Sequence, residues 1–330
     1  METNIGILLA YLENVCQKVV FPPKRGAKHK YSRASFVIFF VVMFLKKIHR
    51  FKSMHKYAQQ HYQNFGWSSC PTRKTIRVRF EALPALLQVL IPELAKVFAL
   101  KDKCFDFKWV FIDKSIFRSL GGIWHAKHMK TGIVPHPSID TEASWAKSDY
   151  HGWRFGYGLH LIVNEFRFPI AAIVATASEK DYNFVETLIE RIHLKISIIV
   201  GDRGYFCAEI IEKINQEFNV LLQTIKPFEQ SCKNAIKDWY NNLILTPQAR
   251  WLYRLRKPSI EPTFAIIKEL FNLIDENQLP YKGLNKVSAY LMTCTITIQI
   301  MMYHNYQNQR KLGDTTLFRT SFNCITPQLL

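Results

Sequence analysis

Acidic residues are absent between Asn14 and Arg79, although this stretch carries 15 Lys or Arg residues, from Lys18 to Arg79. A surface that only keeps a protein in solution mixes both signs of charge. The excess extends to the whole chain of 330 residues, which has a net charge of +18. A stretch with positive charges and no negative ones predicts contact with a polyanion. The alternative is a basic face that serves solubility alone.

Paired cysteines and long apolar runs are also lacking. The seven cysteines are scattered and form no C-x-x-C pair, which excludes a disulfide framework and a zinc-finger pattern and fits a reducing cytosol. The strongest apolar run, residues 36–45, has ten residues, about half of the ~20 that a membrane-spanning helix needs. The first residues do not have the basic-then-apolar layout of a signal peptide. We therefore expect a globular cytoplasmic protein.

The first hundred residues have helical periodicity. We predict helices over residues 36–48 and 53–61, then a break at Gly66 and Pro71. Thr72 can cap the next helix, residues 73–90. A short helix, a turn and a helix with a basic first half are the layout of a helix-turn-helix DNA reader. The basic residues that begin the last helix are Arg73, Lys74, Arg77 and Arg79.

Strand patterns begin near residue 108. Apolar or alternating segments predict strands at 109–117, 155–163, 168–176, 197–202 and 219–224. Helices are predicted at 183–193 and 207–218, from Ser259 onward, and at 284–303. This order predicts an α/β fold with a mixed sheet flanked by helices, preceded by an all-α domain. The expected division is residues 1–105, 106–280 and 281–330, the last a helix and a polar tail.

Three carboxylates carry the functional prediction. Asp113 closes the apolar run WVFID, and Asp202 closes SIIVGD and precedes RGY. Glu261 opens a helical pattern, with Lys268 seven residues later. Open α/β sheets place ligands at the carboxyl ends of their strands, so these acids can converge on one point. Clustered carboxylates are costly unless divalent metal ions lie between them, as in enzymes that displace phosphate esters.

Other readings of these acids remain open. A single acid at a strand end is often only a loop residue, and Glu at a helix start is favoured by the helix dipole. Three further carboxylates, Asp140, Asp149 and Asp181, are rivals. Asp181 is predicted to cap a helix, and Asp140 is the best substitute if Asp113 is not catalytic.

The combined pattern D…GDRGY…E-x6-K, with PSID at 137–140 and GWRFGYGLHL at 152–161, resembles the acidic-triad (DDE) transposases of bacterial insertion sequences. The resemblance covers roughly residues 108–271. It implies a ribonuclease-H-like catalytic domain that cuts DNA strands and joins them to a target. Asp113, Asp202 and Glu261 would hold two Mg²⁺ (or Mn²⁺) ions. The phosphate contacts would be Lys268, Arg256, Lys257 and Arg203. The implied partners are double-stranded DNA, at the element ends and the target, and a second copy of the chain in a homodimer.

Two departures from the family pattern leave alternatives. Gly158 stands where the family commonly has a lysine, in Gly-Tyr-Lys-Leu-His. Lys257, not an arginine, lies four residues before Glu261, and Arg254 fills the tyrosine slot, with Tyr253 one position off. An arginine-to-lysine change weakens bidentate phosphate binding. The alternatives are therefore a catalytically inactive, sequence-specific DNA-binding derivative and a structure-specific DNA nuclease.

Overall fold

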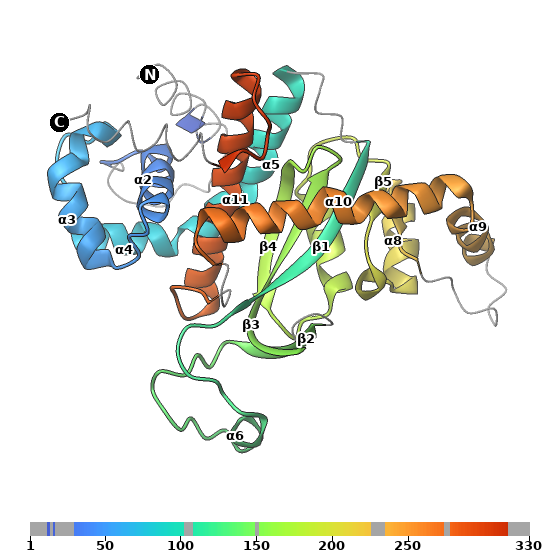
Figure 1. Cartoon of the computed structure of the whole chain (residues 1–330), viewed down its shortest axis with the longest axis horizontal. Helices are drawn as coiled ribbons and strands as arrows, with labels where there is room; N and C mark the ends of the chain where they lie inside the picture. The colour runs from blue at the N-terminus through green and yellow to red at the C-terminus, as the bar shows by residue number, and fades with distance from the viewer. Residues whose placement is uncertain are drawn as a thin grey trace.

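The computed structural model describes residues 12, 13, 16, 30–101, 108–148, 152–225, 235–273 and 278–315. Asp149, residues 17–29 of the acid-free stretch and the tail beyond residue 315 lie outside the described residues. Within the described part, a central sheet is surrounded by helices (Figure 1). The N-terminal helices, residues 33–101, are called the helical group, and its first helices lie to one side of the sheet.

The sheet has both strand directions. β1 pairs antiparallel with β3, and β3 pairs antiparallel with β4, while β5 and β6 run parallel to β1. The order β4-β3-β1-β5-β6 is that of a ribonuclease-H-like domain, so the predicted fold class is confirmed. A short strand that was not predicted, β2, pairs with the first part of β3. The bounds are β1 Trp109–Arg118, β2 Ser144–Ser148, β3 Gly152–Asn164, β4 Pro169–Thr176, β5 Ile198–Val200 and β6 Leu221–Gln223.

The N-terminal helices largely follow the predicted pattern. They are α2 Arg33–Leu45, α3 Phe51–His61, η1 Tyr62–Phe65, α4 Arg73–Glu81 and α5 Leu83–Lys101. Thr72 caps α4 by accepting a hydrogen bond from the Thr75 N–H at 3.1 Å. The single helix expected over residues 73–90 is wrong, since α4 and α5 meet at a bend of 56°. Pro84 explains the break, because proline lacks an N–H and clashes with the preceding helical turn.

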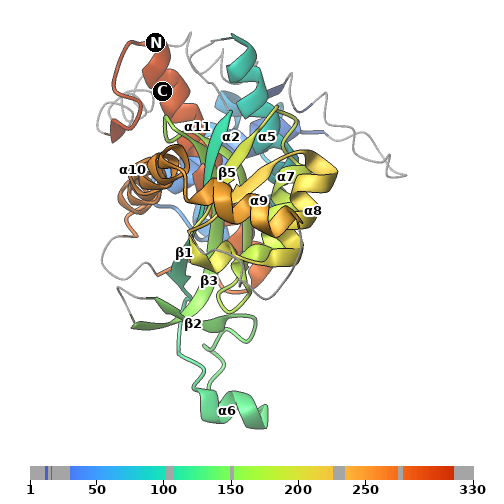
Figure 2. The same ribbon diagram turned by 90° about the vertical axis from the view of Figure 1, so that its right-hand side faces the viewer.

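The remaining helices follow β1 along the chain, and most of them lie around the sheet. They are α6 Ala126–Thr131, η2 Asp181–Phe184, α7 Val185–Glu190, η3 Arg203–Tyr205, α8 Ala208–Phe218, α9 Ala235–Ile244, α10 Pro247–Leu270 and α11 Leu284–Gln307. The helix expected to begin at Ser259 in fact begins at Pro247, with Pro258 and Pro262 inside it. As a result, Glu261 lies well inside α10 and not at its start. α10 crosses the sheet on one face, and α7 and α8 lie on the opposite side (Figures 1 and 2).

A single hydrophobic core connects the helical group with the sheet. α11 is its central element, since its residues are buried from Val287 to Asn305 and it packs against α5 and β4. Gln299 of α11 donates hydrogen bonds of 2.9 Å to the carbonyls of Ile91 in α5 and Pro169 in β4. In the part of the chain that the structure describes, no single helix is long and apolar enough to cross a membrane. α4 and α5 pass that test only when counted together across their bend.

Candidate active site

Asp113 lies in the middle of β1. The strand predicted at 109–117 is confirmed, but Asp113 is not at its carboxyl end as expected of the acids, because residues 114–118 continue to pair with β3. Its Oδ2 accepts a hydrogen bond of 2.8 Å from Arg256 Nη1 of α10, and its Oδ1 accepts one of 2.8 Å from the backbone N–H of Lys114. Both charged side chains are mostly buried, with 17% of Asp113 and 14% of Arg256 exposed. Asp113 therefore meets α10 through a buried ion pair.

Asp202 lies beside Asp113 at the neighbouring strand. β1 and β5 are parallel and pair Phe111 with Val200, so the two aspartates both come two residues beyond this pair. Asp202 Oδ1 accepts a hydrogen bond of 2.9 Å from the Gly204 N–H, which caps the short helix η3. This cap fixes the carboxylate at the end of β5. The sheet register thus brings two of the three predicted acids together.

The electrostatics of Asp113 reflect this neighbour. The pKa of Asp113 is raised to about 6, chiefly by burial and in smaller part by the negative charge of Asp202. The Arg256 guanidinium and the Lys114 N–H act in the opposite direction. Burial also acts to lower the pKa of Arg256, but the charges of Asp113 and then Asp202 raise it. The single positive charge of Arg256 thus interacts with the negative charges of both Asp113 and Asp202.

A third aspartate, Asp181, also lies near Asp202. The prediction that it caps a helix is wrong, since Lys180 holds the cap position of η2 and Asp181 forms an ion pair with Lys114. A Cβ placed on Gly204 would lie 2.5 Å from Asp181 Oδ2 and 3.1 Å from Asp202 Oδ1. The two carboxylates therefore flank the same glycine. The sequence signal that was overlooked is an acid a few residues beyond the end of β4.

Arg256, and not Lys257, faces the aspartates from α10. The guanidinium lies over the Tyr253 ring, 5.8 Å from its centroid. Its Nε is buried and has no hydrogen-bond partner. Lys257 is exposed on another side of the helix. The tyrosine and arginine that face the sheet are thus three residues apart, although the arginine does not have the family's spacing from Glu261.

Glu261 is exposed on α10. It comes five residues after Arg256, which at about 100° per residue turns it roughly 140° away around the helix. Lys257 and Lys268 lie close to the same stripe as Glu261 by this count. Among the described residues, no three His, Cys, Asp or Glu side chains come together in a group that could hold a metal ion. The structure therefore pairs Asp113 with Asp202 and leaves Glu261 on a different side of α10 from Arg256.

Lys268 is anchored further along β1. Its Nζ lies 5.9 Å from the centroid of the Phe117 ring. Burial lowers the pKa of Lys268, and the nearby Arg154 lowers it further. α10 thus contacts β1 at Asp113 through Arg256 and at Phe117 through Lys268, so helix and strand run in the same direction. Glu261 lies along α10 between these two contacts. The remaining predicted phosphate contact, Arg203, is exposed in η3.

Lys114 occupies the space beside Gly158. The β1–β3 register pairs Lys114 with His160 and Ile116 with Gly158. A Cβ on Gly158 would lie 2.8 Å from Lys114 Cδ, too close for a real contact. The Lys114 ammonium also donates hydrogen bonds of 3.4 Å to the carbonyls of Ala177 and Glu179. Lys114 therefore holds the segment after β4 against β1, in space that Gly158 leaves free.

Asp140 has a structural role, so the expectation that it could substitute for Asp113 is wrong. It is 3% exposed. Its Oδ2 accepts hydrogen bonds from Ser119 Oγ at 2.9 Å, Tyr157 OH at 2.8 Å and the Gly283 N–H at 3.0 Å. Its Oδ1 accepts one of 3.2 Å from the Glu142 N–H. These four donors satisfy both oxygens and fix the end of β1 to the start of α11.

The four predicted DNA contacts of α4 have different surroundings. Arg73 and Lys74 are exposed in its first turn. Arg77 pairs with Glu81 at 3.0 Å. Arg79 lies over the Phe36 ring at 5.6 Å, and burial, followed by the charge of Arg33, lowers its pKa. Arg73 and Lys74 are therefore the best placed of the four to reach a phosphate.

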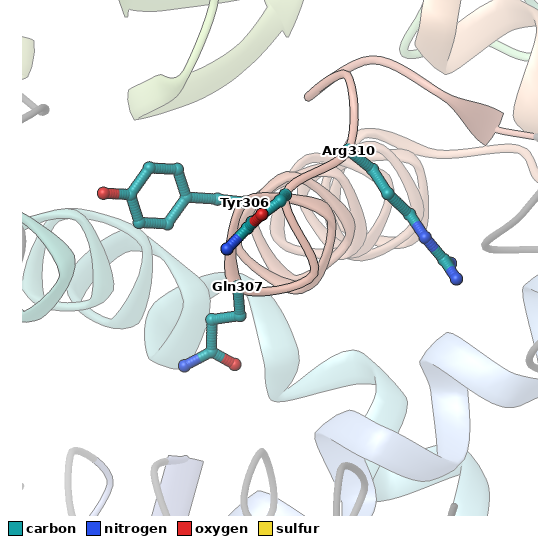
Figure 3. Close-up of a pocket in the computed structure, with 4 residues that line it drawn as sticks. Tyr306, Gln307 and Arg310 are labelled. Carbon is teal, nitrogen blue, oxygen red and sulfur yellow. The ribbon is translucent and has the colours of Figure 1, made fainter.

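A hollow at the end of α11 lies in another part of the molecule. Its lining residues are Tyr306, Gln307, Gln309 and Arg310. Tyr306, Gln307 and Arg310 point in different directions around the helix (Figure 3). None of the lining residues is a carboxylate, so the hollow does not compete with the aspartate site.

Residues 126–300 match the protein family described as "Transposase DDE domain". The match includes Asp202, Glu261 and Lys268 and begins after Asp113. No curated protein sequence matches the chain. Two solved structures have a loose likeness, each at 9% identity. The piggyBac transposase synaptic complex with hairpin DNA has a TM-score of 0.38 and covers 95% of this chain and 75% of its own. The Mos1 transposase paired-end complex with the left transposon end has a TM-score of 0.21 and covers 74% and 80%.

Proposed function

The chain belongs to the family of transposase DDE domains, and on that basis we propose that it cuts DNA at the terminal repeats of an insertion sequence and joins the freed ends to a target. The observation that carries this proposal is the position of Asp113 and Asp202, side by side two residues beyond a paired position of β1 and β5. Adjacent carboxylates in a partly buried place attract a cation. The family membership supplies DNA as the substrate of this site.

Asp113 and Asp202 fit a divalent metal ion. Both are hard oxygen ligands of the type that Mg²⁺ and Mn²⁺ prefer. Their mutual repulsion raises the pKa of Asp113 after burial has done so, and a bound cation would relieve it. We propose that these two aspartates and Glu261 hold two such ions. The ions, when bound, would activate the attacking hydroxyl and stabilise the leaving oxygen of the DNA backbone.

Glu261 would need to approach the aspartates from α10. Pro258 and Pro262 lie on either side of it inside the helix. Each proline removes a backbone donor and disturbs the turn before it. The helix is thereby weakened at the position where it would have to rotate to bring Glu261 toward the site. This weak point supports the proposal that Glu261 completes the metal site when DNA binds.

The cations around the site would hold the DNA backbone. Arg256 has a buried Nε without a hydrogen-bond partner, which a phosphate oxygen would satisfy. Lys268, Lys257 and Arg203 would contact further phosphates by charge. The helical group, through Arg73 and Lys74, would recognise the terminal repeats. Cutting two ends together would use two active sites, and hence a homodimer on the DNA.

One observation favours the inactive DNA-binding derivative as a second candidate. Glu261 does not share a helix face with Arg256, and no three of the described carboxylates form a group that could hold a metal ion. A chain that had lost catalysis could keep this arrangement. Measuring cleavage and metal binding separately distinguishes the two candidates.

The test uses Asp113→Asn, Asp202→Asn and Glu261→Gln, with Glu190→Gln, an exposed acid of α7, as the matched control. DNA carrying the sequences that flank the gene is incubated with each protein and Mg²⁺ or Mn²⁺. We expect each site variant to lose cleavage by about a thousandfold or more, because a metal ligand contributes several kcal/mol to the transition state. DNA binding should stay within about twofold of the unchanged protein, because no phosphate contact is removed. Unchanged cleavage in Asp202→Asn would contradict the proposed site.

A further inference from the structure

The segment between β1 and β2, residues 119–143, leaves the sheet and returns to it. We call it the β1–β2 arm. It carries α6 near its far end and extends away from the sheet in both views (Figures 1 and 2). None of the proposed metal ligands lies in the arm, so the metal site does not explain why the chain extends here.

The base of the arm is fixed to the body. Asp140 accepts hydrogen bonds from Ser119 at one leg and from Gly283 before α11. The two legs touch where a Cβ on Gly121 would lie 2.2 Å from the Ser138 carbonyl oxygen, and Gly121 has a φ of +92°. Only glycine tolerates both this φ and this approach. The arm therefore leaves the body in a defined direction.

The inside of the arm is also ordered by hydrogen bonds. Trp124 Nε1 donates to the Ile133 carbonyl at 2.8 Å, across the arm from one leg to the other. Trp145 Nε1 of β2 donates to the Trp124 carbonyl at 2.8 Å. An arm held in this way loses little conformational entropy when it binds a partner.

The outer part of the arm, residues 120–139, carries charge of one sign. It has no Asp or Glu and contains Lys127 and Lys130, whereas the two acids of the arm, Asp140 and Glu142, lie at its base. Lys127 and Lys130 are exposed on α6, and His125 and His136 are also exposed. The part of the arm that extends from the body is therefore basic.

Basic side chains line the path from the active site to the base of the arm. Lys268 lies over Phe117, and the next residue of β1 is Arg118 at the base of the arm. Burial lowers the pKa of Arg154 in β3, and the charge of Arg118 lowers it further. Arg154 in turn lowers the pKa of Lys268, after burial. Lys268, Arg154 and Arg118 are therefore close neighbours and form a basic track from α10 to the arm.

We propose that the β1–β2 arm, with Arg118 and Arg154, binds the DNA duplex beside the bond that is cut. The proposal rests on the proposed function, because it takes DNA at the aspartate site as its starting point. A strand rises about 3.3 Å per residue, so the arm begins roughly 20 Å from Asp113 along β1. One turn of B-DNA spans about 34 Å. The base of the arm therefore lies within about one turn of duplex from the cleavage site.

A second copy of the chain is the other possible occupant. Ile133 and Val134 of the arm are 56% and 43% exposed, and such side chains can pack at a dimer interface. However, the outer part of the arm, residues 120–139, carries only positive charges, and a second copy has the same net charge of +18. Repulsion between like charges opposes that contact and favours DNA.

The test is the double variant Lys127→Gln/Lys130→Gln. The matched control, Lys195→Gln/Lys311→Gln, removes the same charge from two exposed lysines outside the track. Binding to a labelled random-sequence duplex of about 40 base pairs (roughly four turns) is measured by fluorescence anisotropy over a range of salt concentrations. We expect the arm variant to bind about tenfold more weakly, and the slope of log K against log salt to fall by about 2, near 0.9 for each lost phosphate contact. The control should keep the slope of the unchanged protein.

Two outcomes would overturn the proposal. One is an equal slope in the arm variant, the control and the unchanged protein. The other is unchanged DNA binding with an altered mass in sedimentation, which would make the arm a protein interface. Mn²⁺ affinity, measured by calorimetry on the same proteins, separates this proposal from the proposed function. The Mn²⁺ affinity depends on the two aspartates, so it should not change in the arm variant. Asp113→Asn and Asp202→Asn should weaken Mn²⁺ binding.

Discussion

At the scale of single residues, Asp113 joins several roles that the sequence does not display together. It is a strand residue, the partner of Arg256 and the neighbour of Asp202. The apolar pattern predicted the strand at 109–117, and β1 agrees with it to within one residue. The expectation that the acid marks a strand end does not hold, because residues 114–118 pair with β3 beyond it. The partners of Asp113 come from β5 and α10, which a local pattern cannot predict.

The raised pKa of Asp113 has a consequence for stability. In the unfolded chain the group titrates near its ordinary value, 3.8, and in the folded protein at about 6. Between these values the folded state binds more protons, so this group makes the protein more stable at pH 4 than at pH 7. We expect the free energy of unfolding of the unchanged protein, minus that of Asp113→Asn, to fall as pH rises from about 4 to about 6 and to stay level above that. Urea unfolding at a series of pH values measures this difference, and a rise through the same window would contradict it.

The acids near Asp113 also show which residues the sequence could identify. Asp202 was predictable, because a buried run followed by Asp-Arg-Gly-Tyr indicates a strand end. Asp181 and Asp140 were misread, because their partners, Lys114 and Tyr157, come from distant positions in the chain. A buried structural carboxylate and a ligand carboxylate look the same in a sequence. Only their donors distinguish them.

At the scale of elements, α10 differs most from its prediction. The sequence predicted a helix from Ser259 onward, directly after Pro258, and proline inside a helix costs ~3 kcal/mol or more. The helix nevertheless continues through Pro258 and Pro262, because one side of it packs on the sheet. Buried side chains on both sides of the prolines, such as Leu252 and Ile267, offset that cost. Packing against the sheet thus outweighs the low helix propensity of proline. The sequence alone cannot predict this outcome, because it does not show which side chains of α10 the sheet buries.

The two prolines give a prediction about α10. Replacing Pro262 by alanine restores a backbone donor in the helix interior and should raise the free energy of unfolding by roughly 1–3 kcal/mol. Pro247→Ala is the matched control, because Pro247 stands in the first turn of α10, where its missing N–H has no helical partner. Urea unfolding of both variants provides the comparison. Equal stability of the two variants would show that the α10 interior carries no such cost.

At the scale of the whole molecule, the helical group and the sheet share one core. α5 packs against α11 and β4, so removing residues 1–105 would expose apolar surface as well as remove charge. The division at residues 105 and 280 therefore remains a proposal. Substitution of single exposed cations is the cleaner way to test the role of the helical group.

Arg73→Gln/Lys74→Gln provides that test, because both side chains are exposed in the first turn of α4. We expect specific binding to the element ends to weaken, and the salt slope of binding to fall by about 2, since each cation that meets a phosphate adds near 0.9. Arg77→Gln should have a smaller effect, because Arg77 is already paired with Glu81. Salt-dependent binding to DNA from either side of the gene is the measurement. An equal or larger effect of Arg77→Gln would place the DNA on another side of α4.

The missing side chain at Gly158 and the long side chain at Lys114 depend on each other across the β1–β3 pair. Any side chain at position 158 would need a shorter residue at position 114, because Lys114 already fills that space. The positive charge at this place on the sheet therefore comes from β1, through Lys114, although position 158 of β3 has no side chain.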